Sequence, residues 1–172
     1  MPQVFKLAKS WIETCREDHQ ACRKHPDVGF YPTRLLDIGF PSPGENPMPS
    51  LVRTACQSKA EAVEYIALSH CWGTALGAHI PRTTRSTLAA REAGIHWDEL
   101  SKTFQDAIKI SQGLGVQFIW IDSLCIIQDD QDDFEIECAQ MGMVYSKAYC
   151  TIAVGIPRNR NSLSWLAKLM HL

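Results

Sequence analysis

A short, almost continuous apolar run at residues 116–122 (VQFIWID) constrains the fold more than any other part of the sequence. Such a run is typical of a strand that is buried on both faces of a sheet. Apolar residues at helical spacing precede it over residues 100–114, with Ser101 or Asp98 as the expected N-cap and Gly115 placed to end the helix. The sequence therefore predicts a central strand that directly follows a helix.

Strands and helices alternate on both sides of this run. Residues 64–70 (EYIALSH) and 149–154 (YCTIAV) predict two further strands. The acidic stretch DDQDD precedes a helix whose expected apolar stripe consists of Phe134, Cys138, Met141 and Tyr145. Because strands that alternate with helices at these spacings form parallel sheets through helical crossovers, we expect an α/β fold with an open, mainly parallel sheet flanked by helices.

The chain is expected to consist of three parts around one core. Residues 1–60 hold an amphipathic helix at 4–22 and a lead-in segment of two short strands separated by a proline-rich loop. Residues 61–156 are the α/β core, and residues 157–172 are a C-terminal tail with one short helix. A chain of 172 residues is long enough to bury a single hydrophobic core of ordinary size.

Composition argues against several classes of protein. The formal net charge is -2, which gives no general attraction to nucleic acid, and no apolar stretch approaches the roughly 18 residues of a membrane span. The N-terminus lacks the apolar core and cleavage site of a secretory signal. Seven cysteines, an odd number without a C-x-x-C pair, fit free thiols in a reducing compartment. We therefore expect a cytoplasmic protein with no membrane span and no nucleic-acid partner.

The carboxyl ends of the predicted parallel strands are the expected place for a ligand. One strand ends in SHCWG, where Trp72 can stack on a base and the Gly73 backbone can approach a phosphate. After the central strand, Asp122 can bind a ribose hydroxyl and Ser123 a phosphate. The candidate ligand-binding residues are Ser69, His70, Cys71, Trp72, Gly73, Asp122, Ser123 and Cys125.

These residues also have a structural interpretation. Cys71 and Trp72 would pack in the core while Gly73 makes the turn, and Asp122 would accept hydrogen bonds from neighbouring backbone N–H groups. The sequence contains no glycine-rich phosphate loop and no G-x-S-x-G elbow, so kinase, P-loop NTPase and α/β-hydrolase hypotheses lack support. The choice between a ligand site and a structural turn stays open.

An acidic run at residues 129–133 offers carboxylate oxygens of the kind that hard divalent cations prefer. Counted as an EF-hand loop, however, it places Phe134 where glycine is required and Gln140 where glutamate is required. We therefore interpret the run as a solvated helix N-terminus.

A second cluster, Cys15, His19 and Cys22, falls on one helical face with His25 close in sequence. A structural zinc site normally draws its ligands from more than one segment. We therefore expect this face to pack against the sheet, and we assign neither a metal site nor a certain cofactor to the chain.

Several separated segments together resemble one family. The most specific are YIALSHCWG, TFQDAI, LGVQFIWIDSLCIIQDD and FEIECAQMGMVYSKAYCTIAV, at 65–73, 103–108, 114–130 and 134–154. Upstream of them, W-x3-C-x3-H-x2-C begins at Trp11 and PTRLLD begins at Pro32. Because these segments occur in this order and at this spacing, the chain resembles the fungal heterokaryon incompatibility (HET) domain from Tyr65 to about Val154.

The resemblance implies both a role and a fold. HET domains act as effectors in fungal non-self recognition and trigger cell death after incompatible hyphae fuse, which implies self-association or a protein partner. The HET domain is also similar to the TIR domain, which implies a TIR-like or flavodoxin-like sheet. Some TIR domains hydrolyse NAD with a glutamate on a helix after a central strand. NAD is therefore a candidate substrate, with Glu137 and Asp122 as candidate catalytic residues.

One segment of the family pattern is missing from the sequence. HET domains continue into R-x-W-x-x-Q-E, whose glutamate is a counterpart of the TIR catalytic glutamate, whereas no acidic residue follows Val154 here. We therefore expect a C-terminally truncated HET domain. Three hypotheses follow: an effector or signalling domain, a TIR-like NAD or nucleotide hydrolase, and a truncated, inactive homologue. The missing glutamate argues against an enzyme.

Overall fold

The structure, a computed structural model, describes residues 3–22, 30–42, 44–54, 63–71, 80–155 and 167–170. Two candidate ligand-binding residues, Trp72 and Gly73, lie outside the described residues, as does His25. Among the described helices, none is both long enough and apolar enough to cross a membrane.

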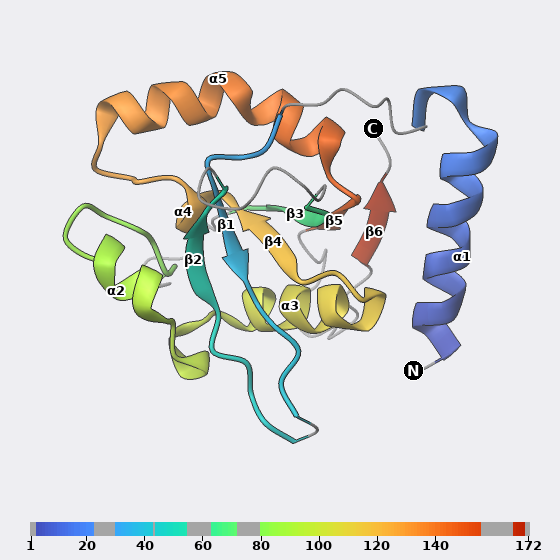
Figure 1. Cartoon of the computed structure of the whole chain (residues 1–172), viewed down its shortest axis with the longest axis horizontal. Coiled ribbons are helices and arrows are strands. Elements are labelled where there is room, and N and C mark those ends of the chain that lie inside the picture. Colours follow the sequence, from blue (N-terminus) through green and yellow to red (C-terminus); the bar gives the residue numbers. More distant parts are fainter. Residues whose placement is uncertain are drawn as a thin grey trace.

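The described residues form six strands of a single sheet, in the order β2-β1-β4-β3-β5-β6 (Figure 1). Their bounds are β1 (Arg34–Asp37), β2 (Ser50–Arg53), β3 (Tyr65–His70), β4 (Phe118–Ile121), β5 (Cys150–Val154) and β6 (Ala167–Met170). The three central strands, β4, β3 and β5, are parallel, whereas β1, β2 and β6 pair antiparallel with their neighbours. The predicted open α/β sheet is confirmed, and its parallel part is the centre.

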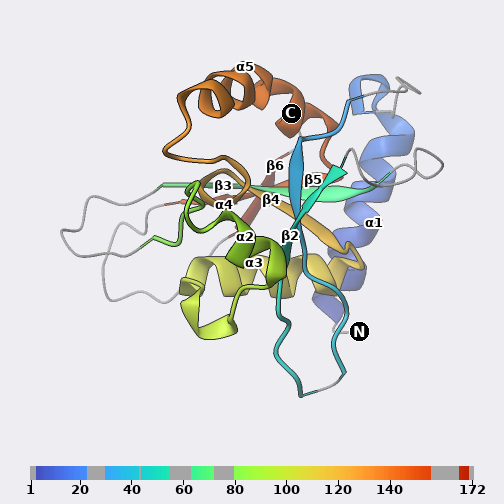
Figure 2. The same ribbon diagram turned by 60° about the vertical axis from the view of Figure 1, so that its left-hand side comes forward.

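Two long helices, α3 (Lys102–Leu114) and α5 (Gln131–Lys147), cover opposite faces of this sheet (Figures 1 and 2). Helix α3 begins after Ser101, whose hydroxyl accepts a hydrogen bond from the Phe104 N–H at 3.3 Å. It ends at Gly115, which has the left-handed φ of 79°. Both predicted ends of this helix are confirmed. The shorter elements are α2 (Leu88–Ala93), the 3-10 helix η3 (Trp97–Glu99) and α4 (Asp122–Cys125).

The hydrophobic core includes β4 and the inward face of α3. Ile119, Trp120 and Ile121 are completely buried, which confirms a central strand covered on both faces. Phe104 and Ile108 of α3 are buried with them. Burial of a side chain of this size contributes roughly 1.5–3 kcal/mol, so the helix and the strand stabilise each other.

Helix α1 (Gln3–Asp18) and the 3-10 helix η1 (Gln20–Cys22) lie at the edge of the molecule, where α1 contacts α3 (Figure 1). The Phe5 ring lies so close to Gly113 that a β-carbon there would come within 2.5 Å of it. The expectation that the Cys15–His19–Cys22 face packs against the sheet is wrong. His19 is exposed and the two cysteines are only half-buried.

The predicted apolar stripe of α5 is also wrong in part. Phe134 is 41% exposed, whereas Glu137 is 1% exposed and Val144 is completely buried. A carboxylate can face inward at this point because Arg34 of β1 is buried beneath the helix, and a buried cation requires an anionic partner.

The predicted C-terminal helix is a further error, because Ala167–Met170 form strand β6. This strand lies antiparallel to β5, with Ala167 opposite Val154. Periodicity cannot separate helix from strand in so short an apolar run. The outer edge of β5 supplies backbone hydrogen-bond partners that the sequence pattern does not reveal.

Candidate functional site at the carboxyl ends of strands β3 and β4

The parallel pairing of β3 with β4 brings two predicted site residues together. Leu68 lies opposite Ile121 in the register, so the residues that follow them meet at the same edge of the sheet. His70 is the last residue of β3 and Asp122 is the first residue of α4. The Nδ1 atom of His70 lies 3.8 Å from Oδ1 of Asp122.

The His70 imidazole is enclosed by the protein. Its side chain is only 5% exposed, and its ring meets the Phe104 ring edge-to-face with 5.1 Å between centroids. Burial lowers the pKa of His70, and the nearby Asp122 carboxylate acts in the opposite direction. The ring is therefore neutral at neutral pH, with one nitrogen as a donor and the other as an acceptor.

Neither ring nitrogen of His70 has a hydrogen-bond partner among the residues that the structure describes. Leaving a buried polar atom unpaired costs about 1–3 kcal/mol. An imidazole held in this way can form a hydrogen bond with a polar group of a ligand. Ligand binding then does not have to remove water from the ring, because the ring is already buried in the folded protein.

Asp122 and Ser123 also stabilise the turn between β4 and α4. An Asp122 carboxylate oxygen accepts a hydrogen bond from the Ser123 N–H at 2.6 Å, and its backbone carbonyl accepts one from the side chain of Gln128 at 3.1 Å. The Ser123 side chain is buried, and its hydroxyl has no partner within the described part of the chain. The carboxylate of Asp122 thus has one of the backbone hydrogen bonds that a structural role requires, and its side chain remains 22% exposed beside His70.

Tyr145 of α5 belongs to the same site. Its ring meets Trp120 edge-to-face with 5.6 Å between centroids. The pKa of the Tyr145 hydroxyl is raised, mainly by burial and to a smaller extent by the Asp122 carboxylate. A hydrogen bond with the Ser69 side chain acts in the opposite direction. Ser69 and Cys71 themselves are exposed. The sequence placed Tyr145 in the helix stripe and did not identify it as a site residue.

Cys125 lies beneath the site and does not reach its surface. The residue is completely buried, and burial raises the pKa of its thiol to about 12. A thiol with such a pKa is not ionised at neutral pH, so it is a poor nucleophile. Its backbone carbonyl accepts a hydrogen bond from Nε of Arg34 at 2.7 Å, which connects the site to strand β1.

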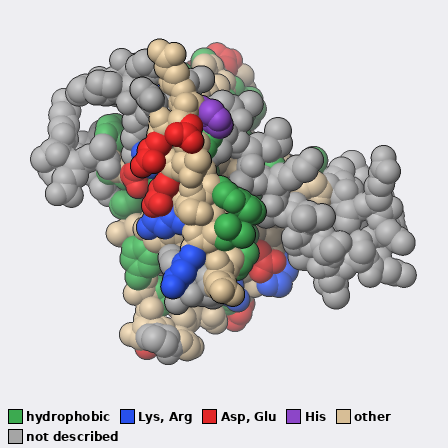
Figure 3. Space-filling view, turned by 90° about the vertical axis from the view of Figure 1, so that its right-hand side faces the viewer, with side chains coloured by type: hydrophobic (Ala, Val, Ile, Leu, Met, Phe, Trp, Pro, Cys, Tyr) green, Lys and Arg blue, Asp and Glu red, His purple; other side chains and the backbone are tan. Residues whose placement is uncertain are grey.

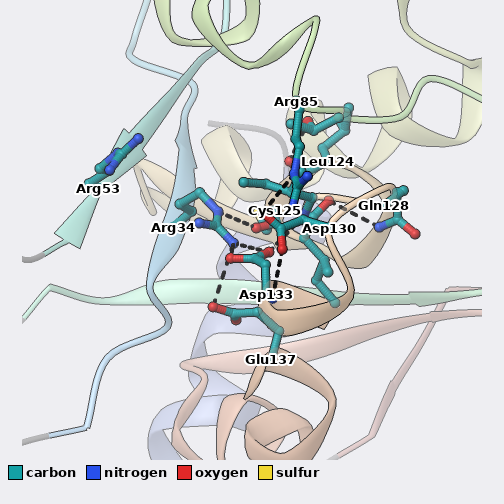
Figure 4. Close-up of polar contacts among 12 residues, drawn as sticks. Arg34, Arg53, Arg85, Leu124, Cys125, Gln128, Asp130, Asp133 and Glu137 are labelled. Atoms are coloured by element: carbon teal, nitrogen blue, oxygen red, sulfur yellow. Dashed lines mark hydrogen bonds and ion pairs between the residues drawn. The ribbon is translucent and has the colours of Figure 1, made fainter. Parts of the chain in front are cut away.

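Arg34 is the centre of a buried ionic cluster (Figure 4). The residue is 4% exposed, and Nη2 donates to the two carboxylate oxygens of Asp133 at 2.6 and 2.5 Å. The same nitrogen lies 3.6 Å from Oε1 of Glu137. Asp133 also accepts the backbone N–H of Ile127 at 2.8 Å. The cluster therefore joins β1, α5 and the segment that follows α4.

Glu137, a candidate catalytic residue, points into this ionic cluster. Burial raises the pKa of Glu137, with Thr33 and Arg34 acting against that rise and Asp133 adding to it. One cation faces two carboxylates, and Asp133 takes the shorter contacts. Glu137 thus helps to anchor α5 to β1. The sequence signal that could have indicated this cluster is Arg34, which directly precedes the apolar Leu35 and Leu36 in a predicted strand.

The acidic run at 129–133 serves the beginning of α5. Asp130 is the N-cap, and its side chain accepts the N–H of Asp133 at 3.3 Å. Its other carboxylate oxygen lies 3.0 Å from Nε of Arg85, and Asp129 accepts the backbone N–H of Arg85 at 2.7 Å. The predicted capping role is confirmed.

The sequence matches one protein-family model over most of its length. The family model described as Heterokaryon incompatibility protein (HET) matches residues 65–171, which is more than half of the 172 residues. The chain belongs to the HET family. Comparison with curated proteins and with solved structures found no match.

The HET match contains the whole His70 site but not the whole sheet. It begins at Tyr65, the first residue of β3, and includes Asp122, Tyr145 and both carboxylates of the ionic cluster. Arg34 lies before it, as do both strands of the β1–β2 hairpin. The sheet that carries the HET match is therefore completed by two strands that lie outside the matched residues.

Proposed function

We propose that this HET domain is an effector in fungal non-self recognition that leads to programmed cell death, and that it acts by associating with a second copy or a protein partner. Membership of the HET family supports the first part of the proposal. An exposed apolar stripe on α1 supports the second part.

The stripe consists of Val4, Leu7 and Trp11, which are 65%, 50% and 61% exposed. Their i, i+3, i+7 spacing places them on one face of the helix. The α1 side of the molecule shows hydrophobic side chains together, with acidic side chains grouped beside them (Figure 3). Single exposed apolar residues are ordinary, but an aligned set that includes a tryptophan is typical of a surface that docks another protein.

The test is expression of the full chain from an inducible promoter in a filamentous fungus, with dead cells counted by a vital dye. We expect the wild-type chain to kill the cells and Trp11→Lys to abolish most of the killing. In vitro, self-association or partner binding should weaken by roughly 30-fold, because a tryptophan at the centre of an interface contributes about 2 kcal/mol.

Phe40→Lys is the matched control, since Phe40 is 58% exposed but lies outside α1. This variant should kill as the wild type does. Equal killing by all three proteins would show that the α1 stripe has no role, and absence of killing by a folded wild-type chain would contradict the effector proposal itself.

A second candidate function is TIR-like hydrolysis of NAD or another nucleotide. The observation that favours it is the buried neutral His70 beside Asp122 and the Ser123 hydroxyl at the carboxyl ends of parallel strands. In this proposal the imidazole binds a ribose or phosphate oxygen, and Asp122 acts as the general acid–base. A positioned acid–base group accelerates such a reaction by about 100-fold to 10,000-fold.

Release of nicotinamide from NAD by the purified chain measures this activity. Asp122→Asn is expected to reduce turnover by about 100-fold or more, whereas Asp106→Asn, a partly exposed carboxylate on α3, should leave it unchanged. Loss of turnover in Glu137→Gln at unchanged stability would instead assign the catalytic role to Glu137. A folded wild-type chain without turnover would exclude NAD hydrolysis and leave the effector proposal intact.

A further inference from the structure

The end of helix α1 gathers three side chains of metal-ligating type. The ligand atoms of Cys15, His19 and Cys22 all lie within 4.8 Å of one another. The closest pair is Sγ of Cys15 and Nδ1 of His19, at 3.2 Å. This cluster is separate from the His70 site and takes no part in the proposed function.

The backbone brings these residues together by ending the α-helix between them. In a continuous α-helix, Cys15 and Cys22 would be about 10.5 Å apart along the axis. Helix α1 instead ends at Asp18, and η1 forms a tighter turn that begins at Gln20. The Cys22 N–H donates to the His19 carbonyl at 2.9 Å, and the His19 N–H donates to the Cys15 carbonyl at 3.1 Å. The two cysteines therefore approach the histidine from two different elements.

We propose that Cys15, His19 and Cys22 bind one Zn²⁺ ion. Tetrahedral zinc with bonds of about 2.3 Å to sulfur and 2.0 Å to nitrogen places neighbouring ligand atoms about 3.5–3.8 Å apart. The spacing in the cluster lies near this range, so a small side-chain adjustment completes the geometry. Two thiolates and one imidazole form a donor set that suits zinc better than calcium or magnesium.

The surroundings of the cluster allow an ion to enter and a fourth ligand to bind. His19 is exposed and the two cysteines are half-buried, so the ion reaches the site directly from solvent. Three protein ligands leave one coordination position for water. Structural zinc sites normally draw their ligands from more than one segment. This cluster meets that requirement, because α1 supplies Cys15 and η1 supplies Cys22.

Next to the proposed zinc ligands, the end of α1 contacts the segment that leads into strand β3. Arg16 follows the first proposed ligand and lies 3.4 Å from the Glu64 carboxylate. Its guanidinium also lies over the Tyr149 ring, 5.1 Å from the centroid. An ion at the proposed site would fix the turn between α1 and η1, next to the arginine that contacts the segments leading into β3 and β5.

The experiment titrates Zn²⁺ into the reduced, metal-free full chain in competition with a chromophoric chelator. We expect one equivalent to bind, with cobalt in place of zinc giving the intense visible bands of a tetrahedral thiolate complex. Cys22→Ser and His19→Gln should each weaken binding by about 100-fold or more, since even loss of a supporting residue around a metal costs 10-fold to 100-fold. Cys71→Ser, which removes an exposed thiol elsewhere, should bind as the wild type does.

Alkylation followed by mass spectrometry supplies a second readout. Zinc should slow the modification of Cys15 and Cys22 but not that of Cys71. Absence of stoichiometric zinc binding, or equal affinity in Cys22→Ser and the wild type, would overturn the proposal. So would a Cys15–Cys22 disulfide that forms in the presence of bound zinc as readily as without it, because ligating thiolates are protected from oxidation.

Discussion

Replacement of Arg34 by methionine is expected to lower the free energy of unfolding by about 3–5 kcal/mol. The arginine side chain is 5% exposed and pairs with Asp133 and with the almost fully buried Glu137. Methionine keeps much of the volume but removes the cation, so two neighbouring carboxylates lose their counter-ion in a medium of low dielectric constant. Urea denaturation followed by circular dichroism measures the effect.

Arg53→Met is the matched control for this change. Arg53 lies on the adjacent strand β2, is 55% exposed, and pairs with Glu92 at 3.2 Å on the surface. Loss of a surface pair of this kind costs less than about 1 kcal/mol. Glu137→Gln combined with Arg34→Met should recover part of the lost stability because it removes one of the uncompensated charges. Equal costs for the two arginine variants would show that the buried cluster does not hold β1 to α5.

Phe104→Ala is expected to lower the free energy of unfolding by about 3–5 kcal/mol, as for other phenylalanines removed from a core. Phe104 is 1% exposed and packs its ring against the His70 imidazole. The substitution therefore leaves a cavity that admits water to one side of His70. Phe134→Ala, on the exposed side of α5, is the matched control and should cost no more than about 0.5 kcal/mol.

The Phe104 variant should also alter the pH dependence of stability. Burial lowers the pKa of His70 in the folded state, so the unfolded chain takes up a proton first as the pH falls. The contribution of His70 is fully present above its ordinary pKa of about 6.5 and is lost as the pH falls toward the lowered pKa of the folded state. Water beside His70 raises that pKa, so the penalty of Phe104→Ala should be smaller at about pH 5.5 than at about pH 7.5. A penalty that is the same at both pH values would show that Phe104 does not control the ionisation of His70.

The central part of the fold could be predicted from the sequence because local signals and burial agree there. The β4 segment is apolar throughout, and α3 carries a capping serine, a terminal glycine and a single buried face. Prediction failed where a distant partner decides the structure. Glu137 faces inward only because Arg34, over 100 residues earlier, is buried opposite it, and β6 is a strand only because β5 offers an edge.

The candidate site was predictable to a similar degree. His70 and Asp122 could be placed at one edge because parallel strands bring their carboxyl ends together. The roles of Cys125 and Glu137 could not be predicted from the sequence, since both depend on the depth of burial and on contacts with β1. Periodicity also did not show the turn that gathers Cys15, His19 and Cys22, because that turn results from the end of the helix.

The pairing of β1 with β4 has a practical consequence for fragments of this chain. A fragment that begins at Tyr65, where the family pattern begins, would leave the buried strand β4 with an open backbone edge, which invites pairing with other molecules. It would also lack Arg34, so Asp133 and Glu137 would face each other without their cation. We therefore expect that expression of the matched segment alone yields aggregate, whereas a fragment that also includes β1 and β2 stays in solution.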